Sequence, residues 1–235
     1  MKIIIIGGVA GGMSAATRLR RLMEDAEIVI FEKGPFVSFA NCGLPYHVSG
    51  EIAERDALLV QTPESLKARF NLDVRPFHEV VKISPEEHTV TVAHDGSEFT
   101  EQYDKLILSP GAKPFIPEIE GLSEATNVFT LRNVPDLDQI MLALDEEPQE
   151  AVVIGAGFIG LETAENLRKR GLNVTIVEKA PHVLPPLDEE MAAFVQAELV
   201  DKGVKVITSQ SATRFEENGK VIVLEDGQKL ASDVT

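Results

Sequence analysis

One unit occurs twice along the chain, and this repeat constrains the fold more than any other feature of the sequence. Each copy contains an apolar run, a glycine-rich turn, a helical stretch and a second apolar run that ends in a glutamate. Short continuous runs of Val and Ile are typical of strands that are buried on both faces of a parallel sheet. The repeat therefore predicts an α/β fold with two Rossmann-like dinucleotide-binding units.

The two copies follow the same plan of strand, turn, helix and strand. In the first copy we expect these elements at Ile3–Ile6, Gly7–Gly12, Met13–Met23 and Glu27–Phe31, with Glu32 closing the unit. In the second copy we expect them at Ala151–Ile154, Gly155–Gly160, Leu161–Arg170 and Val174–Val177, with Glu178 closing the unit. Gly171 is expected to end the second helix, because glycine readily takes the left-handed conformation that follows a helix.

The glycine turns indicate dinucleotide binding. A tight glycine turn lets backbone N–H groups approach a pyrophosphate, and an acid at the end of the next strand binds the ribose hydroxyls. The second turn, Gly155–Gly160, has the full G-x-G-x-x-G spacing, whereas the first turn keeps Gly7 and Gly12 but has Val9 in the middle place. The alternative interpretation of each glycine turn is a tight connection between a strand and a helix that binds no ligand.

Two dinucleotide sites in one chain suit the passage of hydride from a nicotinamide to a flavin, where the protein supplies orientation and the cofactors supply the chemistry. We therefore expect FAD in the first unit and NADH or NADPH in the second. Glu178 favours NADH, because an acid at this place disfavours a 2′-phosphate. Lys179 follows it directly and could accept that phosphate, so both nucleotides stay open.

The remaining segments complete the predicted organisation. Between the copies we expect a small antiparallel β insertion, a further strand and a helix, at Val74–Ile83, Thr89–Ala93, Glu98–Tyr103, Lys105–Leu108 and Pro135–Leu144. After the second copy we expect a helix and two strands, at Asp188–Lys202, Val204–Ile207 and Val221–Leu224, with Asp188 as the N-cap. This gives an FAD-binding domain over 1–115, a connection over 116–150 and an NAD(P)H-binding domain over 151–235. Another strand is expected to begin at the very end of the chain, so the sequence reads as part of something longer.

Composition excludes some partners and indicates a compartment. The formal net charge of −16 disfavours binding to nucleic acid or to anionic lipid. No apolar run is long enough to span a bilayer, and the apolar start Met1–Gly7 is too short for a signal peptide. The single cysteine allows no internal disulfide, which favours the cytoplasm. The histidines have no spacing that indicates a metal site.

Cys42 is the candidate redox residue. It lies ten residues after Glu32, in the segment Ser38–Pro45. A lone cysteine is most often a small buried hydrophobe. Here Gly43 and Pro45 indicate a sharp turn into a helix, and a helix N-terminus favours the thiolate that attacks disulfides. His47 could tune this thiolate, although packing is the simpler role for it.

Three segments together resemble one known family: Gly7–Gly12, Ser38–Pro45 and Gly155–Glu162. They are similar to the single-cysteine branch of the pyridine nucleotide-disulfide oxidoreductases, and within it to the coenzyme A-disulfide reductases and the coenzyme A persulfide reductases that carry a rhodanese domain. The stretch Leu59–Phe70 also resembles that subgroup. The similarity covers the whole chain, and Val9 in the first turn recurs in this branch.

The resemblance assigns roles to individual residues. Cys42 would be the catalytic cysteine, exchanging with coenzyme A or its persulfide. The FAD contacts implied are Gly7, Gly8, Val9, Ala10, Gly11, Gly12, Glu32, Lys33, Val80, Ser109 and Gly111, with Arg132 close to the cofactors. The nicotinamide nucleotide would contact Gly155, Gly157, Phe158, Ile159, Gly160, Glu162, Glu178 and Lys179. The coenzyme A contacts implied are Ser14, Arg18, Arg21, Ser38 and Asn41; for the two arginines, a solvated helix face is the alternative.

The activity implied is transfer of hydride from NAD(P)H through FAD to Cys42, which reduces coenzyme A disulfide or persulfide. The nearest alternative is an NADH oxidase or peroxidase that uses Cys42 as a sulfenic acid. A ferredoxin or rubredoxin reductase, in which the cysteine is incidental, and a dinucleotide-binding module without turnover are the others. Family members continue beyond this length into a segment that completes the FAD domain and a domain that forms a homodimer, and residues 1–235 do not contain them.

Overall fold

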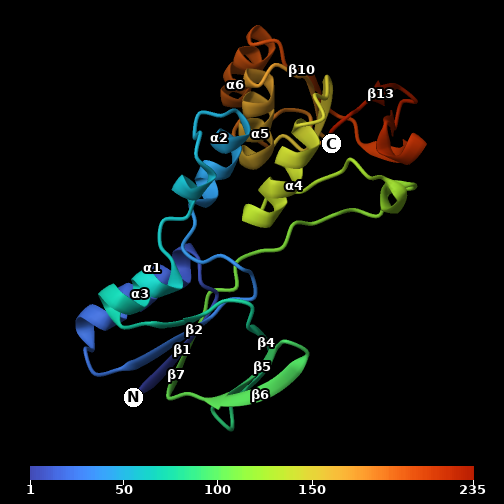
Figure 1. Cartoon of the computed structure of the whole chain (residues 1–235). Helices are drawn as coiled ribbons and strands as arrows, with labels where there is room; N and C mark the ends of the chain where they lie inside the picture. The colour runs from blue at the N-terminus through green and yellow to red at the C-terminus, as the bar shows by residue number, and fades with distance from the viewer. The chain divides into compact units, whose positions relative to one another are not determined.

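The computed structural model describes all residues from 1 to 235, and contacts group them into two compact units. The first unit comprises Met1–Ala40 and Arg55–Lys113, and the second comprises Asn41–Glu54 and Pro114–Thr235 (Figure 1). The short segment that carries Cys42 therefore belongs with the second unit. The division into cofactor domains at 115 and 151 stays a prediction.

The first unit is built on a parallel sheet. Its strands are β1 (Lys2–Ile6), β2 (Glu27–Phe31), β3 (Asp73–Arg75) and β7 (Lys105–Leu108), in the order β3-β2-β1-β7. The helices are α1 (Ala10–Leu22) and α3 (Pro63–Phe70). Helix α3 begins at a capping box in which Thr62 and Ser65 bind each other's backbone N–H groups.

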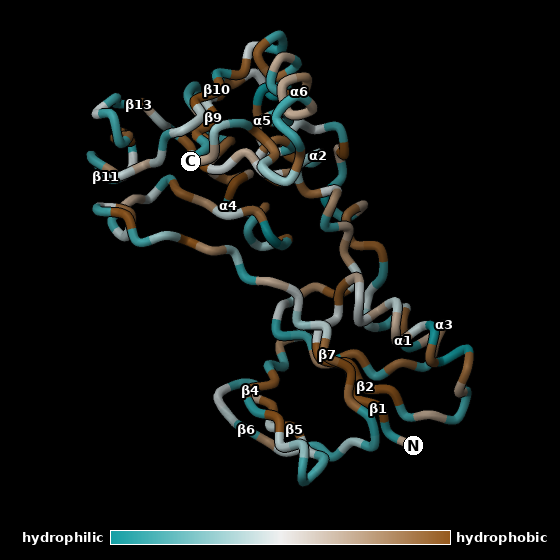
Figure 2. Tube along the Cα trace, turned by 180° about the vertical axis from the view of Figure 1, so that it is seen from behind, coloured by the Kyte–Doolittle hydropathy of each residue, from teal (hydrophilic) through white to brown (hydrophobic).

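The parallel sheet of the first unit is covered on both faces. Ile3 and Ile5 pack with residues of α1 and α3, whereas Ile4 packs with Val90 and Val92 of an antiparallel sheet. That second sheet consists of β4 (Glu79–Ser84), β5 (Thr89–His94) and β6 (Ser97–Gln102). Figure 1 shows the helices on one side and the antiparallel strands on the other, and Figure 2 shows β1 and β2 in the hydrophobic colours expected of strands buried on both faces.

The second unit repeats this plan. Its parallel strands are β8 (Glu150–Ile154), β9 (Asn173–Val177) and β10 (Lys205–Ile207), in the order β10-β9-β8. Val152 and Val177 pack against a three-stranded antiparallel sheet of β11 (Ala212–Glu216), β12 (Val221–Leu224) and β13 (Lys229–Ala231). The helices of this unit are α2 (Leu44–Val48), α4 (Val134–Leu144), α5 (Phe158–Lys169) and α6 (Glu189–Asp201).

The internal repeat is longer than the sequence motifs indicate. In both units a helix and a third parallel strand follow the motif, and an antiparallel three-stranded sheet leads to a fourth position beside the first strand. In the first unit β7 fills this position, and in the second unit Val234 forms a parallel bridge with Ala151. The predicted α/β fold with two Rossmann-like units is confirmed, and so is the beginning of a strand at the end of the chain.

Several element boundaries differ from the sequence-based predictions. The predicted strand Val74–Ile83 is two strands of different sheets, β3 and β4, because the chain turns at Pro76 and at Phe77, which has a φ of +59°. Helices α1 and α5 begin three residues earlier than predicted, so that the last glycines of both turns lie inside the first helical turn. Asp188 precedes α6 as expected, but its side chain makes no capping hydrogen bond.

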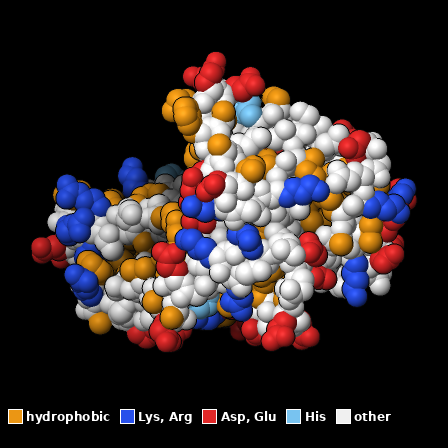
Figure 3. Space-filling model, turned by 90° about the horizontal axis from the view of Figure 1, so that it is seen from above, with side chains coloured by type: hydrophobic (Ala, Val, Ile, Leu, Met, Phe, Trp, Pro, Cys, Tyr) orange, Lys and Arg blue, Asp and Glu red, His pale blue; other side chains and the backbone are white.

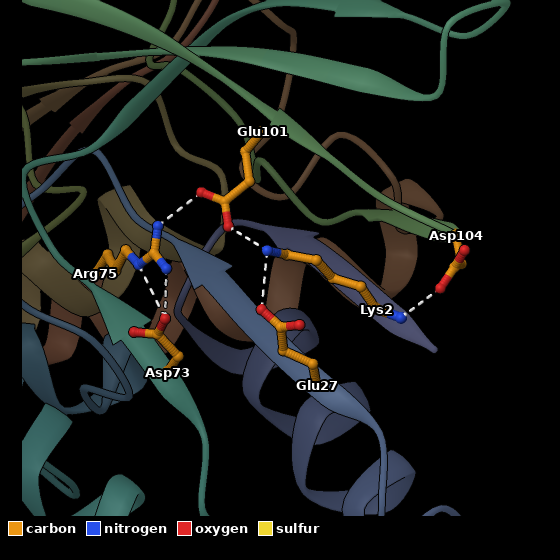
Figure 4. Close-up of polar contacts among 6 residues, drawn as sticks. All are labelled: Lys2, Glu27, Asp73, Arg75, Glu101 and Asp104. Carbon is orange, nitrogen blue, oxygen red and sulfur yellow. Dashed lines mark hydrogen bonds and ion pairs between the residues drawn. The ribbon is translucent and has the colours of Figure 1, made fainter.

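Charged side chains join the two sheets of the first unit. The Glu101 carboxylate of β6 lies 2.6 Å from Lys2 Nζ and 2.7 Å from an Arg75 guanidinium nitrogen (Figure 4). Glu27 and Asp73 bind the same two cations from the parallel sheet. Burial opposes the charge of Lys2, but the hydrogen bonds that its ammonium group donates to Glu101 and Glu27 outweigh this effect and raise the pKa of Lys2. The network therefore fastens β6 to β1 and β3.

The exposed surface carries both signs of charge. On the face seen in Figure 3, acidic side chains lie among basic and apolar ones. None of the helices is both long enough and apolar enough to cross a membrane.

Candidate functional site

The glycine turn of the second unit joins β8 to α5. Gly155 has a φ of +103°, and its N–H donates to the Val177 carbonyl at 2.8 Å. A Cβ on Gly160 would fall far inside the closest approach to the Gly155 carbonyl oxygen, so the helix and the turn can pack this closely only with glycine there. Because α5 begins directly after Gly157, the turn ends at a helix N-terminus with free N–H groups.

Gly157 needs a different explanation from its neighbours. Its φ of −76° suits any residue, and no heavy atom lies within 4 Å of the place where a Cβ would be. Neither backbone strain nor packing within the fold therefore requires glycine here. A side chain would instead occupy the exposed space in front of the helix N-terminus, where a pyrophosphate approaches in dinucleotide sites. The free space at Gly157 therefore fits a bound dinucleotide, whereas the packing of the turn itself gives no reason for glycine at this position.

Glu178 follows β9 and braces the same turn. One carboxylate oxygen accepts the Ala156 N–H at 2.6 Å, and the other accepts the Ala180 N–H at 2.7 Å. The acid predicted to bind ribose hydroxyls therefore also holds the turn, a role that its position in the sequence does not reveal. Each carboxylate oxygen has a second lone pair for a further donor. Lys179 beside it is exposed.

The first unit repeats this arrangement. Glu32 accepts the Gly8 N–H at 2.7 Å and the Gly34 N–H at 2.8 Å, and a Cβ on Gly12 would collide with the carbonyl of Gly7. Val9, the departure from the motif, is the N-cap of α1. The two turns therefore have the same construction, with a glutamate as the brace in each.

Two other residues assigned to FAD lie against the first turn. A Cβ on Gly7 would strike the Ser109 carbonyl, and a Cβ on Gly11 would lie 3.3 Å from the Ser109 hydroxyl oxygen. The Ser38 N–H donates to the Gly8 carbonyl at 2.8 Å. The ends of β1 and β7 and the segment before Cys42 therefore converge at this turn within the first unit.

The remaining predicted cofactor residues are distributed over both units. Val80 packs at the edge of the cluster formed by β2 and β5, and Lys33 and Gly111 are exposed. Arg132 lies in the second unit, before α4, and its N–H donates to Asp136 at 2.9 Å. On the first turn and a half of α5, Phe158 and Ile159 are 63% and 60% exposed, which is unusual for large apolar side chains, and Glu162 is half-buried.

Cys42 is exposed and lies in a short 3-10 helix, Asn41–Gly43, that runs directly into α2. The predicted sharp turn into a helix is present, and Pro45 occupies the first turn of that helix. His47 Nδ1 lies 2.7 Å from the Ile52 carbonyl oxygen, so the ring is engaged with its own segment. Because the thiol is exposed, Cys42 is not the small buried hydrophobe that a lone cysteine most often is.

Four of the predicted coenzyme A contacts lie in the first unit. Ser14, Arg18 and Arg21 are all exposed and share one face of α1, since their spacing follows the helical repeat. Ser38 has a φ of +47° and is held by the glycine turn as described. Asn41, the fifth, neighbours Cys42 in the second unit.

Two parallel-sheet units, each with a glutamate-braced glycine turn at a helix N-terminus, have the construction that is typical of dinucleotide-binding proteins. The chain belongs to the pyridine nucleotide-disulphide oxidoreductase family, because the sequence model of that family matches residues 1–235.

Known relatives agree with this assignment. A coenzyme A disulfide reductase of Staphylococcus haemolyticus is 42% identical over 84% of this chain and 45% of its own length. An NADH oxidase of Methanocaldococcus jannaschii is 38% identical over 100% of this chain and 53% of its own. The crystal structure of reduced Bacillus anthracis CoADR-RHD matches with a TM-score of 0.97 and 51% identity, over 99% of this chain and 42% of that one. The chain thus spans about half the length of the relatives it matches.

Proposed function

We propose that this chain forms the FAD-binding and NAD(P)H-binding part of a reductase that acts on coenzyme A disulfide or coenzyme A persulfide through Cys42. The observation that carries the proposal is the exposed Cys42 at the start of a helix, in a chain with two dinucleotide turns. Similarity to coenzyme A disulfide reductases supports the substrate class.

The two turns would hold the two cofactors. FAD would lie against Gly7–Gly12 with Glu32 and Ser109 beside it, and the nicotinamide nucleotide against Gly155–Gly160 with Glu178 at its ribose. When bound, the pair supplies hydride from the nicotinamide and electron storage in the flavin. Glu178 supports NADH over NADPH, because a 2′-phosphate would meet a carboxylate. Phe158 and Ile159 would cover an apolar ring of the nucleotide, which would explain their exposure.

Cys42 would perform the sulfur chemistry. Its thiolate attacks one sulfur of coenzyme A disulfide, a bond forms between Cys42 and that half, and the other half leaves as coenzyme A thiolate. Reduction of this mixed disulfide by two electrons would then regenerate the Cys42 thiolate and release the second half as coenzyme A. With persulfide as substrate, the attack would fall on its outer sulfur and coenzyme A thiolate would leave, so that the two electrons would release the transferred sulfur from Cys42 as hydrogen sulfide.

The exposed face of α1 would bind the ligand. Arg18 and Arg21 suit the phosphates of coenzyme A, since a guanidinium pairs well with phosphate oxygens. Ser14 lies on the same face, and Ser38 and Asn41 precede the cysteine. We propose that the full-length protein is a cytoplasmic homodimer that binds neither nucleic acid nor membranes.

The test is a Cys42→Ser variant of the FAD-loaded protein. Reduction of coenzyme A disulfide should fall by at least about a hundredfold, because the nucleophile is lost. The bleaching of flavin absorbance by NADH should persist, because the hydride step does not need the thiol. Full disulfide reduction by the variant would contradict the proposal and would favour a ferredoxin reductase-like role.

An NADH oxidase is the second candidate, and the similarity to the M. jannaschii protein favours it. In that case Cys42 would cycle through a sulfenic acid rather than a mixed disulfide. Mass spectrometry of the untreated protein separates the two, since it shows either a coenzyme A adduct on Cys42 or added oxygen. Absence of FAD binding altogether would leave only a dinucleotide-binding module.

A further inference from the structure

The helix that carries Cys42 at its start is fastened at its other end by one arginine of the nicotinamide unit. Arg170 is the C-cap of α5, and its guanidinium donates to the carbonyl of Val48, the last residue of α2, at 3.0 Å. The same guanidinium lies 3.8 Å from the carboxylate of Asp145, the C-cap of α4. All three helices belong to the second unit.

This arrangement is favourable for electrostatic reasons. A helix C-terminus carries partial negative charge and unpaired carbonyl groups, which attract cations. Here the ends of α2, α4 and α5 meet at a single guanidinium, whose fork of donors can serve several acceptors at once. Next to it, Lys169 lies 3.2 Å from Glu51, just beyond the end of α2. The contact is therefore built from two adjacent basic residues of α5.

Arg168 provides a contrast on the same helical turn. Its guanidinium donates to the carbonyls of Leu172 and Lys202, which lie within the Rossmann-like part of the unit. It stabilises the end of α5 but makes no hydrogen bond or ion pair with α2. The chain therefore contains two similar arginine contacts, of which only one reaches the cysteine segment.

We propose that Arg170 is a positioning residue for Cys42. The 3-10 helix Asn41–Gly43 and α2 form one continuous helical segment, so that fixing its C-terminal end on α5 fixes the direction of its N-terminal end, where the sulfur lies. Since α5 begins at the turn Gly155–Gly160, one helix would connect the nicotinamide site to the support of the cysteine. This inference rests on the proposed role of Cys42.

The test compares Arg170→Ala, Arg170→Lys and the matched control Arg168→Ala in the FAD-loaded protein. Arg170→Ala should lower the kcat for coenzyme A disulfide by about tenfold or more, because a small displacement of a reacting group costs this much. Flavin reduction by NADH in a single turnover should stay within about twofold, and Arg170→Lys should recover part of the loss, since an ammonium can reach one carbonyl but cannot fork. Arg168→Ala should lower the Tm about as much as Arg170→Ala does, but it should leave the kcat for coenzyme A disulfide unchanged.

A second readout does not depend on turnover. The rate at which iodoacetamide alkylates Cys42 in the NADH-reduced protein, followed against pH, should change in Arg170→Ala and not in Arg168→Ala. If Arg168→Ala matches Arg170→Ala in both readouts, or if Arg170→Ala changes neither, the positioning role is wrong. These outcomes differ from failure of the proposed function, which would appear as full disulfide reduction by Cys42→Ser.

Discussion

At the level of single residues, the three glycines of the turn Gly155–Gly160 have different structural roles. Gly155 has a positive φ that favours glycine, and Gly160 lets the helix pack closely on the turn. At Gly157 neither the backbone conformation nor the packing requires glycine. The spacing alone predicts the motif but does not separate these roles, because they depend on φ and on which atoms surround the missing side chain. Gly157 is therefore the position where fold and ligand binding can be tested apart.

Gly157→Ala and Gly160→Ala form a matched pair for that test. Gly160→Ala should lower the free energy of unfolding by about 1–3 kcal/mol, because the new methyl group must displace the Gly155 carbonyl. Gly157→Ala should leave stability nearly unchanged and weaken NADH binding by about tenfold or more. Urea denaturation and a fluorescence titration with NADH measure the two effects. Equal loss of stability in both variants would contradict this account of the turn.

The two glutamates show what sequence reasoning missed at this scale. Glu32 and Glu178 were expected at the ribose because of their place after the second strand. In the structure each carboxylate also accepts two backbone N–H groups, one from the glycine turn and one from the residue two positions on. Such contacts follow from the backbone path of the turn, which the spacing of residue types does not specify.

At the scale of elements, Asp233 fixes the start of β8. One of its carboxylate oxygens accepts the N–H groups of Glu150 and Gln149, both at 2.9 Å. These two hydrogen bonds outweigh the effect of burial and lower the pKa of Asp233. Asp104 does the same for β1 by accepting the Lys2 N–H at 2.6 Å, so in each unit an aspartate binds the start of the first strand of the repeat.

Asp233→Asn should reveal this contribution through its dependence on pH. A carboxylate with a lowered pKa in the folded state stabilises the protein above the ordinary aspartate pKa of about 4, and the effect is lost as the pH falls through the lowered value. At pH 7 the variant should therefore be less stable by about 1 kcal/mol or less, given solvent screening. As the pH falls below about 4 and through the lowered pKa, the stabilities of the two proteins should converge.

Urea denaturation across this pH range gives the result, with Asp188→Asn as the control. The Asp188 side chain makes no capping hydrogen bond, so its substitution should change stability by less than about 0.5 kcal/mol at every pH. A difference between wild type and Asp233→Asn that stays constant with pH would show that the aspartate acts through packing and not through its charge.

Strongly periodic elements could be predicted from the sequence, and those set by tertiary contacts could not. The buried strands β1, β2, β8 and β9 and the helix α4 lie where their apolar patterns indicate. The apolar pattern predicts one strand where the structure has β3 and β4. The two are told apart only by their partners, because β3 pairs with β2 and β4 pairs with β5. Helix α3 was missed because its capping box uses Ser65 in place of the usual acid or amide.

At the scale of the whole molecule, the duplicated unit predicted the architecture, and the structure extends the duplication to the antiparallel sheets and the fourth strand position. The grouping of 41–54 with the second unit was not predictable. It depends on packing of α2 against α4 and α5, about a hundred residues further along the chain, and no local pattern marks such a contact. The long-range packing of this short segment therefore could not be predicted from the sequence.

If the chain functions as proposed, electrons would pass from a nicotinamide through a flavin towards Cys42. The visible absorption spectrum of the purified, FAD-incubated protein during titration with NADH tests it most directly. The flavin bands should bleach as NADH is added, because hydride would pass from the nicotinamide to the flavin. A protein that stays colourless, or whose flavin bands persist at saturating NADH, would contradict it.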